Sequence, residues 1–343
     1  MTGTIRLTCK MMSQGYEHVA VACWQGSQCG CCCLARCLEF VTHLASEPLS
    51  KMTITILFYN THLFLDTHPV RRTILDDEER TDAIVSSILR RRPEIVALCE
   101  VWAEARAARV VRALERDYPF HFRPEGRAGF VLSSGLLLMS RLPIRHAEFS
   151  PYYDSPDPRR ADMGFITAAL SRPDTEELAC RLIMTHDQAT FDNDFERYAK
   201  IRSQNRTRII QRANEFPADG APLIVTGDLN VIGESTEYES MRKQYEGLDL
   251  VDMWTTHHGV SQPAPTPREG LTFSGSANPL IEAFDGKEMA RSEERLDYVW
   301  VSASTWPGWR KCEVERNAYE YQHSATEIWP ASDHYALEAT LEL

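Results

Sequence analysis

Short apolar runs alternate along this chain with longer amphipathic segments. Six runs are typical of buried strands, at residues 53–59, 95–99, 135–141, 181–185, 223–225 and 295–301. Three segments predict helices, at residues 76–92, 103–117 and 194–215. In the first of these, Ile84, Val85 and Ile88 follow helical spacing, and the acidic start and arginine-rich end complement a helix dipole. Strands that alternate with helices predict an α/β fold.

Most of the apolar runs are accompanied by a polar side chain at one end. These side chains are Asn60, Glu100, His186, Asp228, Asn230 and Asp297, and Ser332-Asp333-His334 stands before one further apolar run. Strand ends that converge on one crevice are where α/β proteins place their chemistry. Carboxylate and amide oxygens suit a divalent cation, and a histidine can take a proton from water near neutral pH. The pattern therefore predicts metal-assisted hydrolysis of a phosphoester.

The order of these motifs over residues 52–343 resembles the endonuclease/exonuclease/phosphatase superfamily. The resemblance implies a four-layer α/β/β/α sandwich, in which two mixed β-sheets pack together and helices cover the outer faces. Two stretches, Gly227-Asp228-Leu229-Asn230-Val231 and Thr185-His186-Asp187-Gln188-Ala189, look like motifs of the neutral and bacterial sphingomyelinase branch.

The resemblance implies a cation site built from oxygen ligands. Glu100 would bind the cation, Asp333 would hold it or its water, and Asn60 would contact it through water or a neighbouring ligand. Such ligands suit Mg²⁺, or Mn²⁺, better than zinc. Without the motif series, Asn60 would be read as a turn residue and Glu100 as an ordinary acid before a helix.

The resemblance also assigns the proton and phosphate chemistry. Asp297 would fix the tautomer of His334, which would take a proton from the attacking water. Asp228 would contact that water or the leaving group, while Asn230 and His186 would donate to phosphoryl oxygens. No serine or cysteine nucleophile stands in the motif series, so direct in-line attack by water is expected.

Histidines and cysteines outside these motifs carry no predicted chemistry. We interpret the other histidines as surface or loop residues, among them His62, His68, His257 and His258. Three cysteines beyond the first fifty-one residues are predicted to be single core or near-surface thiols, namely Cys99, Cys180 and Cys312.

The resemblance implies hydrolysis of sphingomyelin to ceramide and phosphocholine at a phospholipid membrane surface. The net charge of −12, without a basic stripe, weighs mildly against a nucleic acid substrate. A magnesium-dependent deoxyribonuclease of the same superfamily is the alternative. An inert scaffold of this fold is less favoured, because every site residue is present.

A membrane contact is predicted at Trp306 and Trp309, which stand on either side of a Pro-Gly turn. The alternative is that both indoles cover the edge of the core, which is the commoner role of a tryptophan.

The first fifty-one residues differ from the rest, since they hold seven of the ten cysteines. The cluster lacks the spaced pairs of a zinc site, palmitoylation is conceivable, and a disulfide framework would require export. We predict that residues 1–51 are a leader, disordered or outside the catalytic fold, with Met52 as the working start. No signal peptide or transmembrane stretch is evident, so a protein that is cytoplasmic or peripheral to a membrane is expected. No protein partner is implied, and we expect a monomer.

Overall fold

The computed structural model describes residues 52–64, 77–130, 132–152, 161–217, 219–259, 270–304 and 308–342. The chain divides into two units, residues 1–51 and 52–343. All described residues belong to the second unit, so the leader predicted over residues 1–51 lies outside them.

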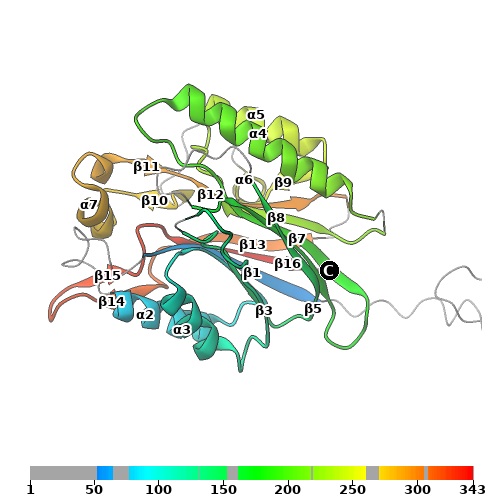
Figure 1. Cartoon of the computed structure of the whole chain (residues 1–343), viewed down its shortest axis with the longest axis horizontal. Coiled ribbons are helices and arrows are strands. Elements are labelled where there is room, and N and C mark those ends of the chain that lie inside the picture. Colours follow the sequence, from blue (N-terminus) through cyan, green and yellow to red (C-terminus); the bar gives the residue numbers. More distant parts are fainter. Residues whose placement is uncertain are drawn as a thin grey trace, which may run out of the picture. The chain divides into compact units, whose positions relative to one another are not determined.

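Two six-stranded sheets form the centre of the second unit (Figure 1). The first sheet has the order β13 (Gly308–Glu315), β16 (Ala336–Glu342), β1 (Thr53–Leu63), β2 (Ile95–Val101), β4 (Leu137–Ser140), β3 (Phe120–Phe122). The second has the order β5 (Ile144–Pro151), β6 (Gly164–Ser171), β7 (Leu178–His186), β8 (Leu223–Asp228), β12 (Asp297–Ser302), β9 (Leu250–Asp252). Both sheets are mixed, because β1 is parallel to β2 and β7 is parallel to β8 whereas their other neighbours are antiparallel.

The alternation of side chains along each strand determines the layers. In β1, Ile56 and Phe58 belong to the core between the sheets, whereas Leu57 and Tyr59 pack in the core under the helices. Leu182 and Met184 of β7 join the core between the sheets. Removing these apolar side chains from water drives the two sheets together. The predicted core thiols Cys99, Cys180 and Cys312 are buried and free.

Helices cover the outer face of each sheet. The first sheet is covered by α2 (Asp77–Arg91) and α3 (Glu104–Leu114), whose Ile84, Ile88 and Val110 pack on it. The second is covered by α4 (Phe195–Asn214) and α5 (Thr236–Glu246), which contribute Ile209, Tyr238 and Met241 to their own core. The predicted four-layer α/β/β/α sandwich is confirmed, and the three predicted helices are present with slightly shorter bounds.

Shorter elements complete the unit. They are α6 (Met253–His258), β10 (Phe273–Ser274), α7 (Pro279–Asp285), the 3₁₀ helix η2 (Met289–Arg291), β11 (Glu293–Glu294), β14 (Glu320–Gln322) and β15 (Ile328–Pro330). Within the described part of the chain, no helix is both long and apolar enough to cross a bilayer.

Candidate active site

The register of the second sheet brings three of the predicted residues together. Asp228 ends β8, and its cross-strand neighbours are His186 at the end of β7 and Asp297 at the start of β12. Neighbouring residues in a ladder project from the same face of a sheet, so the three side chains share one wall. The sequence predicted this convergence, and the pairing of strands β7, β8 and β12 produces it.

Asn60 joins the first sheet to this wall. Its Nδ2 donates to Asp228 Oδ2 at 2.9 Å, and its Oδ1 accepts from the backbone N–H of His62 at 3.2 Å. The hydroxyl of Ser332 donates to the carbonyl oxygen of Asn60 at 2.7 Å, which fixes the segment that carries Asp333 and His334. Both polar ends of the Asn60 side chain are therefore engaged within the protein.

His334 and Asp297 form a buried pair. His334 Nδ1 lies 2.8 Å from Asp297 Oδ2, and the ring packs edge-on against Phe273. A carboxylate that accepts from Nδ1 leaves Nε2 as the ring nitrogen open to a reactant. Burial lowers the pKa of His334, but the charge of Asp297 and its hydrogen bond, followed by the charge of Asp228, raise it well above its usual range.

A second cluster contains Glu100, Asp333 and a histidine that sequence reasoning missed. His62 Nδ1 lies 2.7 Å from Asp333 Oδ2 and 3.6 Å from Glu100 Oε2. Its ring stacks on Phe284 with centroids 4.4 Å apart. The interpretation of His62 as a surface or loop residue is therefore wrong, because it is buried in β1 with 6 % of its surface exposed.

A sequence signal for His62 existed. It stands two residues after Asn60, and residues two apart in an extended strand lie on the same face. Of the other histidines in that interpretation, His257 and His258 are exposed but belong to α6, and His68 lies outside the described residues.

Three residues of the site have backbone angles that most side chains avoid. The φ angles are 46° at His62, 57° at Glu100 and 50° at Asn230. Such angles cost free energy and persist where the surrounding structure holds them. The loop after β8 is held in this way, since Leu229 N donates to Leu296 O at 3.0 Å and Tyr298 Oη donates to Val231 O at 2.6 Å.

His186 and Asn230 are the two residues predicted to donate to phosphoryl oxygens, and both line the same cavity. His186 Nε2 lies 3.6 Å from Glu100 Oε1 and 3.7 Å from Asp228 Oδ2, and its Nδ1 is buried without a hydrogen-bond partner in the described residues. Asn230 Nδ2 donates to the carbonyl oxygen of Asp187 at 3.0 Å, so it is oriented by the residue that follows β7.

These residues border a cavity of about 1330 Å³. The predicted residues that line it are Glu100, His186, Asp228, Asn230, Asp333 and His334, together with His62. Asn60 and Asp297 are buried behind the wall and act on it through Asp228 and His334.

The cavity wall fits a divalent cation. Four carboxylates of the site are buried, those of Glu100, Asp228, Asp297 and Asp333. The one arginine among the described lining residues, Arg202, is bound to Glu237 at 2.6 Å. Burial and the charge of Asp297 raise the pKa of Asp228 to about 6, and Asp297 Oδ1 is buried without a hydrogen-bond partner in the described residues. Buried negative charge in excess is stabilised by a bound cation, and hard oxygen donors suit magnesium or manganese.

Burial opposes the ionisation of Asp333, but His62 and His334 hold its pKa well below the usual range. The Asp333 carboxylate is therefore charged, as a metal-binding group must be. Asp228, Asp297 and His334 also bring one potential ligand atom each to within 4.8 Å of the others.

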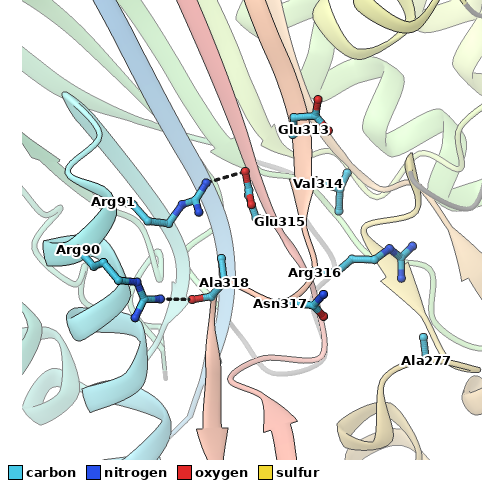
Figure 2. Close-up of a pocket in the computed structure, with 9 residues that line it drawn as sticks. All are labelled: Arg90, Arg91, Ala277, Glu313, Val314, Glu315, Arg316, Asn317 and Ala318. Carbon is cyan, nitrogen blue, oxygen red and sulfur yellow. Dashed lines mark hydrogen bonds and ion pairs between the residues drawn. The ribbon is translucent and has the colours of Figure 1, made fainter.

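A second hollow, of about 790 Å³, shows different chemistry (Figure 2). Two of its three arginines make structural contacts, because Arg91 pairs with Glu315 at 2.6 Å and Arg90 donates to the carbonyl oxygen of Ala318 at 2.8 Å. These contacts join α2 to β13 and to the segment before β14. Both arginines therefore have a structural role, and we assign no binding site to this hollow.

Asp187 beside His186 gives a prediction about stability. Burial raises its pKa from 3.8 to about 6, although Asn205 Nδ2 and Gln188 N donate to its Oδ1. The folded protein thus binds this proton more tightly than the unfolded chain, and stability falls as the pH rises through this interval. Asp187→Asn should raise the free energy of unfolding above about pH 7, by at most about 3 kcal/mol, and have little effect near about pH 4.

Urea unfolding at both pH values measures this effect. Asp192→Asn is the matched control, because it makes the same change at an exposed aspartate. The φ of Asp192 is positive, and asparagine tolerates such an angle. An equal gain for Asp187→Asn at both pH values would contradict the account based on burial.

The predicted membrane contact falls outside what the structure describes. Trp306 is not among the described residues, and the same is true of the side chain of Trp309. That prediction stays a prediction.

Comparisons with known proteins agree with the fold. The model of the endonuclease/exonuclease/phosphatase family matches residues 57–334, so the chain belongs to this family. No match is found among curated protein sequences.

Three solved structures illustrate the structural likeness. A double mutant of the beta toxin from Staphylococcus aureus, with bound magnesium ions, has a TM-score of 0.65 and 17 % identity, covering 84 % of this chain and 99 % of that one. Sphingomyelinase C from Streptomyces griseocarneus has a TM-score of 0.63 and 22 % identity, covering 84 % and 99 %. D. rerio TDP2 complexed with a single-strand DNA product has a TM-score of 0.59 and 18 % identity, covering 84 % and 98 %. Identities this low show the shared fold alone.

Proposed function

We propose that this protein is a metal-dependent phosphodiesterase that hydrolyses a choline phospholipid, with sphingomyelin converted to ceramide and phosphocholine. The observation that carries the proposal is the buried His334–Asp297 pair beside the carboxylates of Asp228 and Glu100, at the wall of one large cavity. Family membership supports a hydrolase acting on phosphodiester bonds.

The residues of the chain account for the proton transfer. Asp297 accepts from Nδ1 of His334, and in the neutral imidazole Nε2 would take the proton of the water that attacks phosphorus. Asp228 lies 3.7 Å from that Nε2 and would orient the water or meet the leaving oxygen. The bond between phosphorus and the ceramide oxygen breaks, this oxygen leaves as an alkoxide that takes a proton from solvent, and the proton on Nε2 of His334 returns to solvent.

The remaining residues would hold the phosphoryl group and the cation. Asn230 and His186 line the cavity and would donate to phosphoryl oxygens. Glu100 and Asp333 would hold the cation, with Asn60 behind them. When bound, a magnesium or manganese ion supplies Lewis-acid polarisation of the phosphoryl oxygen and stabilises the leaving alkoxide. The magnesium ions of the beta toxin support the choice of ion.

The charge of the cavity supports a lipid over a nucleic acid. Carboxylates outnumber free cationic groups among its described lining residues, and the whole chain carries a net charge of −12. A polyanion is attracted chiefly by arginine and lysine, which are scarce here. The likeness to sphingomyelinase C supports the same choice, whereas TDP2 with its DNA product keeps a nuclease as the alternative.

A substrate panel tests the proposal. With added Mg²⁺, the protein is expected to release phosphocholine from sphingomyelin in detergent micelles at least about tenfold faster than it cleaves supercoiled plasmid or single-stranded DNA. Chelation by EDTA should abolish the hydrolysis, and Mg²⁺ or Mn²⁺ should restore it. Metal-dependent cleavage of DNA without release of phosphocholine would reverse the assignment.

A further inference from the structure

Exposed apolar side chains gather at the cavity that contains the site. Five large apolar residues of the described chain are markedly exposed, namely Phe130, Phe195, Ile232, Met289 and Ile328. Three of the five line this cavity, with exposed fractions of 59 % for Phe195, 38 % for Ile232 and 38 % for Met289. Side chains of this kind in one place mark a surface that contacts an apolar partner.

The three residues come from three separate elements. Phe195 is the first residue of α4, Ile232 lies in the loop after β8, and Met289 begins η2. In Figure 1, α7 and β11, which precede and follow η2, lie at the end of the unit where α4 begins. We call Phe195, Ile232 and Met289 the mouth residues.

Acidic residues next to the mouth residues in the sequence indicate which kind of partner this surface can bind. Glu196 follows Phe195 in the sequence, and Asp285 and Glu288 precede Met289; all three acids line the cavity, and none of them is buried. A surface with these carboxylates is repelled by an anionic bilayer and by nucleic acid. The outermost group of a choline phospholipid is a quaternary ammonium, which carboxylates and aromatic rings attract.

We propose that the mouth residues form a docking face that rests on the surface of a zwitterionic phospholipid bilayer and opens the cavity toward its head groups. This inference rests on the proposed function, because the lipid drawn into the cavity is its substrate. Phe195, Ile232 and Met289 enter the interfacial layer, while Glu196, Asp285 and Glu288 remain among the choline groups. The face differs from the predicted contact at Trp306 and Trp309.

Vesicle sedimentation tests the proposal with a matched control. The test variant is Phe195→Ser combined with Met289→Ser, which removes two mouth residues and leaves the helix cap at Asp194 in place. The control is Ile328→Ser, because Ile328 of β15 is 62 % exposed but does not line the cavity. Thermal melting of each variant checks folding, and Phe195→Ser alone serves if the double variant is unstable.

Each result has a defined meaning. We expect the double variant to lose at least about tenfold in partition onto phosphatidylcholine vesicles, since burying each side chain is worth about that factor. Its ratio of hydrolysis on vesicles to hydrolysis of a soluble chromogenic phosphodiester should fall to a similar extent. Ile328→Ser should match the unaltered protein in both assays.

Equal partition of the two variants would overturn the docking face, as would binding that increases when anionic lipid is added. The proposed function is judged separately, by hydrolysis of sphingomyelin in detergent micelles by the unaltered protein. If the unaltered protein hydrolyses sphingomyelin in micelles but the mouth residues do not affect binding to vesicles, only the docking face is rejected. No release of phosphocholine there removes the proposed function.

Discussion

Replacing His334 with alanine is expected to lower turnover by about 10²–10⁴-fold, the range that loss of a general base commonly gives. The reason is geometric, because Asp297 holds Nδ1 at 2.8 Å and leaves Nε2 beside Asp228 in the cavity wall. The measurement is kcat on a soluble phosphodiester at saturating Mg²⁺, with thermal melting as the check that the variant stays folded.

A second variant, Asp297→Asn, tests whether His334 acts as a base or only contributes to packing. Asp297→Asn keeps the shape of the side chain but removes the charge that sets the tautomer of His334. The double variant of His334→Ala and Asp297→Asn should lose no more activity than His334→Ala alone, since residues that act as a unit are not additive. Losses that multiply would mean that the two side chains act independently.

Glu100→Gln is expected to raise the Mg²⁺ concentration needed for half-maximal activity by at least about tenfold, with partial rescue at high Mg²⁺. Glutamine keeps the volume and the acceptor for the indole N–H of Trp102, which donates to Glu100 Oε2 at 3.2 Å. It removes the negative charge that a hard cation prefers. Mn²⁺ binding followed by electron paramagnetic resonance measures the cation affinity without any turnover.

Glu288→Gln is the matched control for Glu100. It removes an exposed carboxylate that lines the same cavity. If the Glu100 residue binds the cation directly, Glu100→Gln should weaken cation binding far more than Glu288→Gln. Equal effects would show that only the summed charge of the cavity matters, and unchanged binding in Glu100→Gln would remove this residue from the metal site.

The layers and most of the site could be predicted from the sequence because both depend on local patterns. Apolar runs such as residues 53–59 and 181–185 are too short for helices, so the sequence predicts strands there. The structure shows both runs to be largely buried. The polar residues that end such runs converge within each sheet because neighbouring parallel strands end at the same edge. Asn60 and Glu100 lie near the ends of β1 and β2 of the first sheet in this way, and His186 and Asp228 end β7 and β8 of the second.

The parts that escaped prediction depend on contacts between distant segments. The one local signal for His62 is its spacing from Asn60, and its contacts with Asp333 and Phe284, which belong to distant segments, are what identify it as part of the site. The mouth residues escaped for a similar reason. Phe195 and Met289 are far apart in the sequence, and no local pattern predicts that both border one cavity.

The place of β16 in the first sheet has a consequence for biosynthesis. This strand lies between β13 and β1, although β1 is the first strand of the unit and β16 is the last. While the ribosome is still making the chain, β1 therefore keeps one unpaired edge until residues 336–342 emerge. An unpaired apolar edge is prone to aggregate, so the nascent chain needs protection during this interval. His334 emerges with the same segment, so under the proposed function the nascent chain would lack its base until this segment has been made.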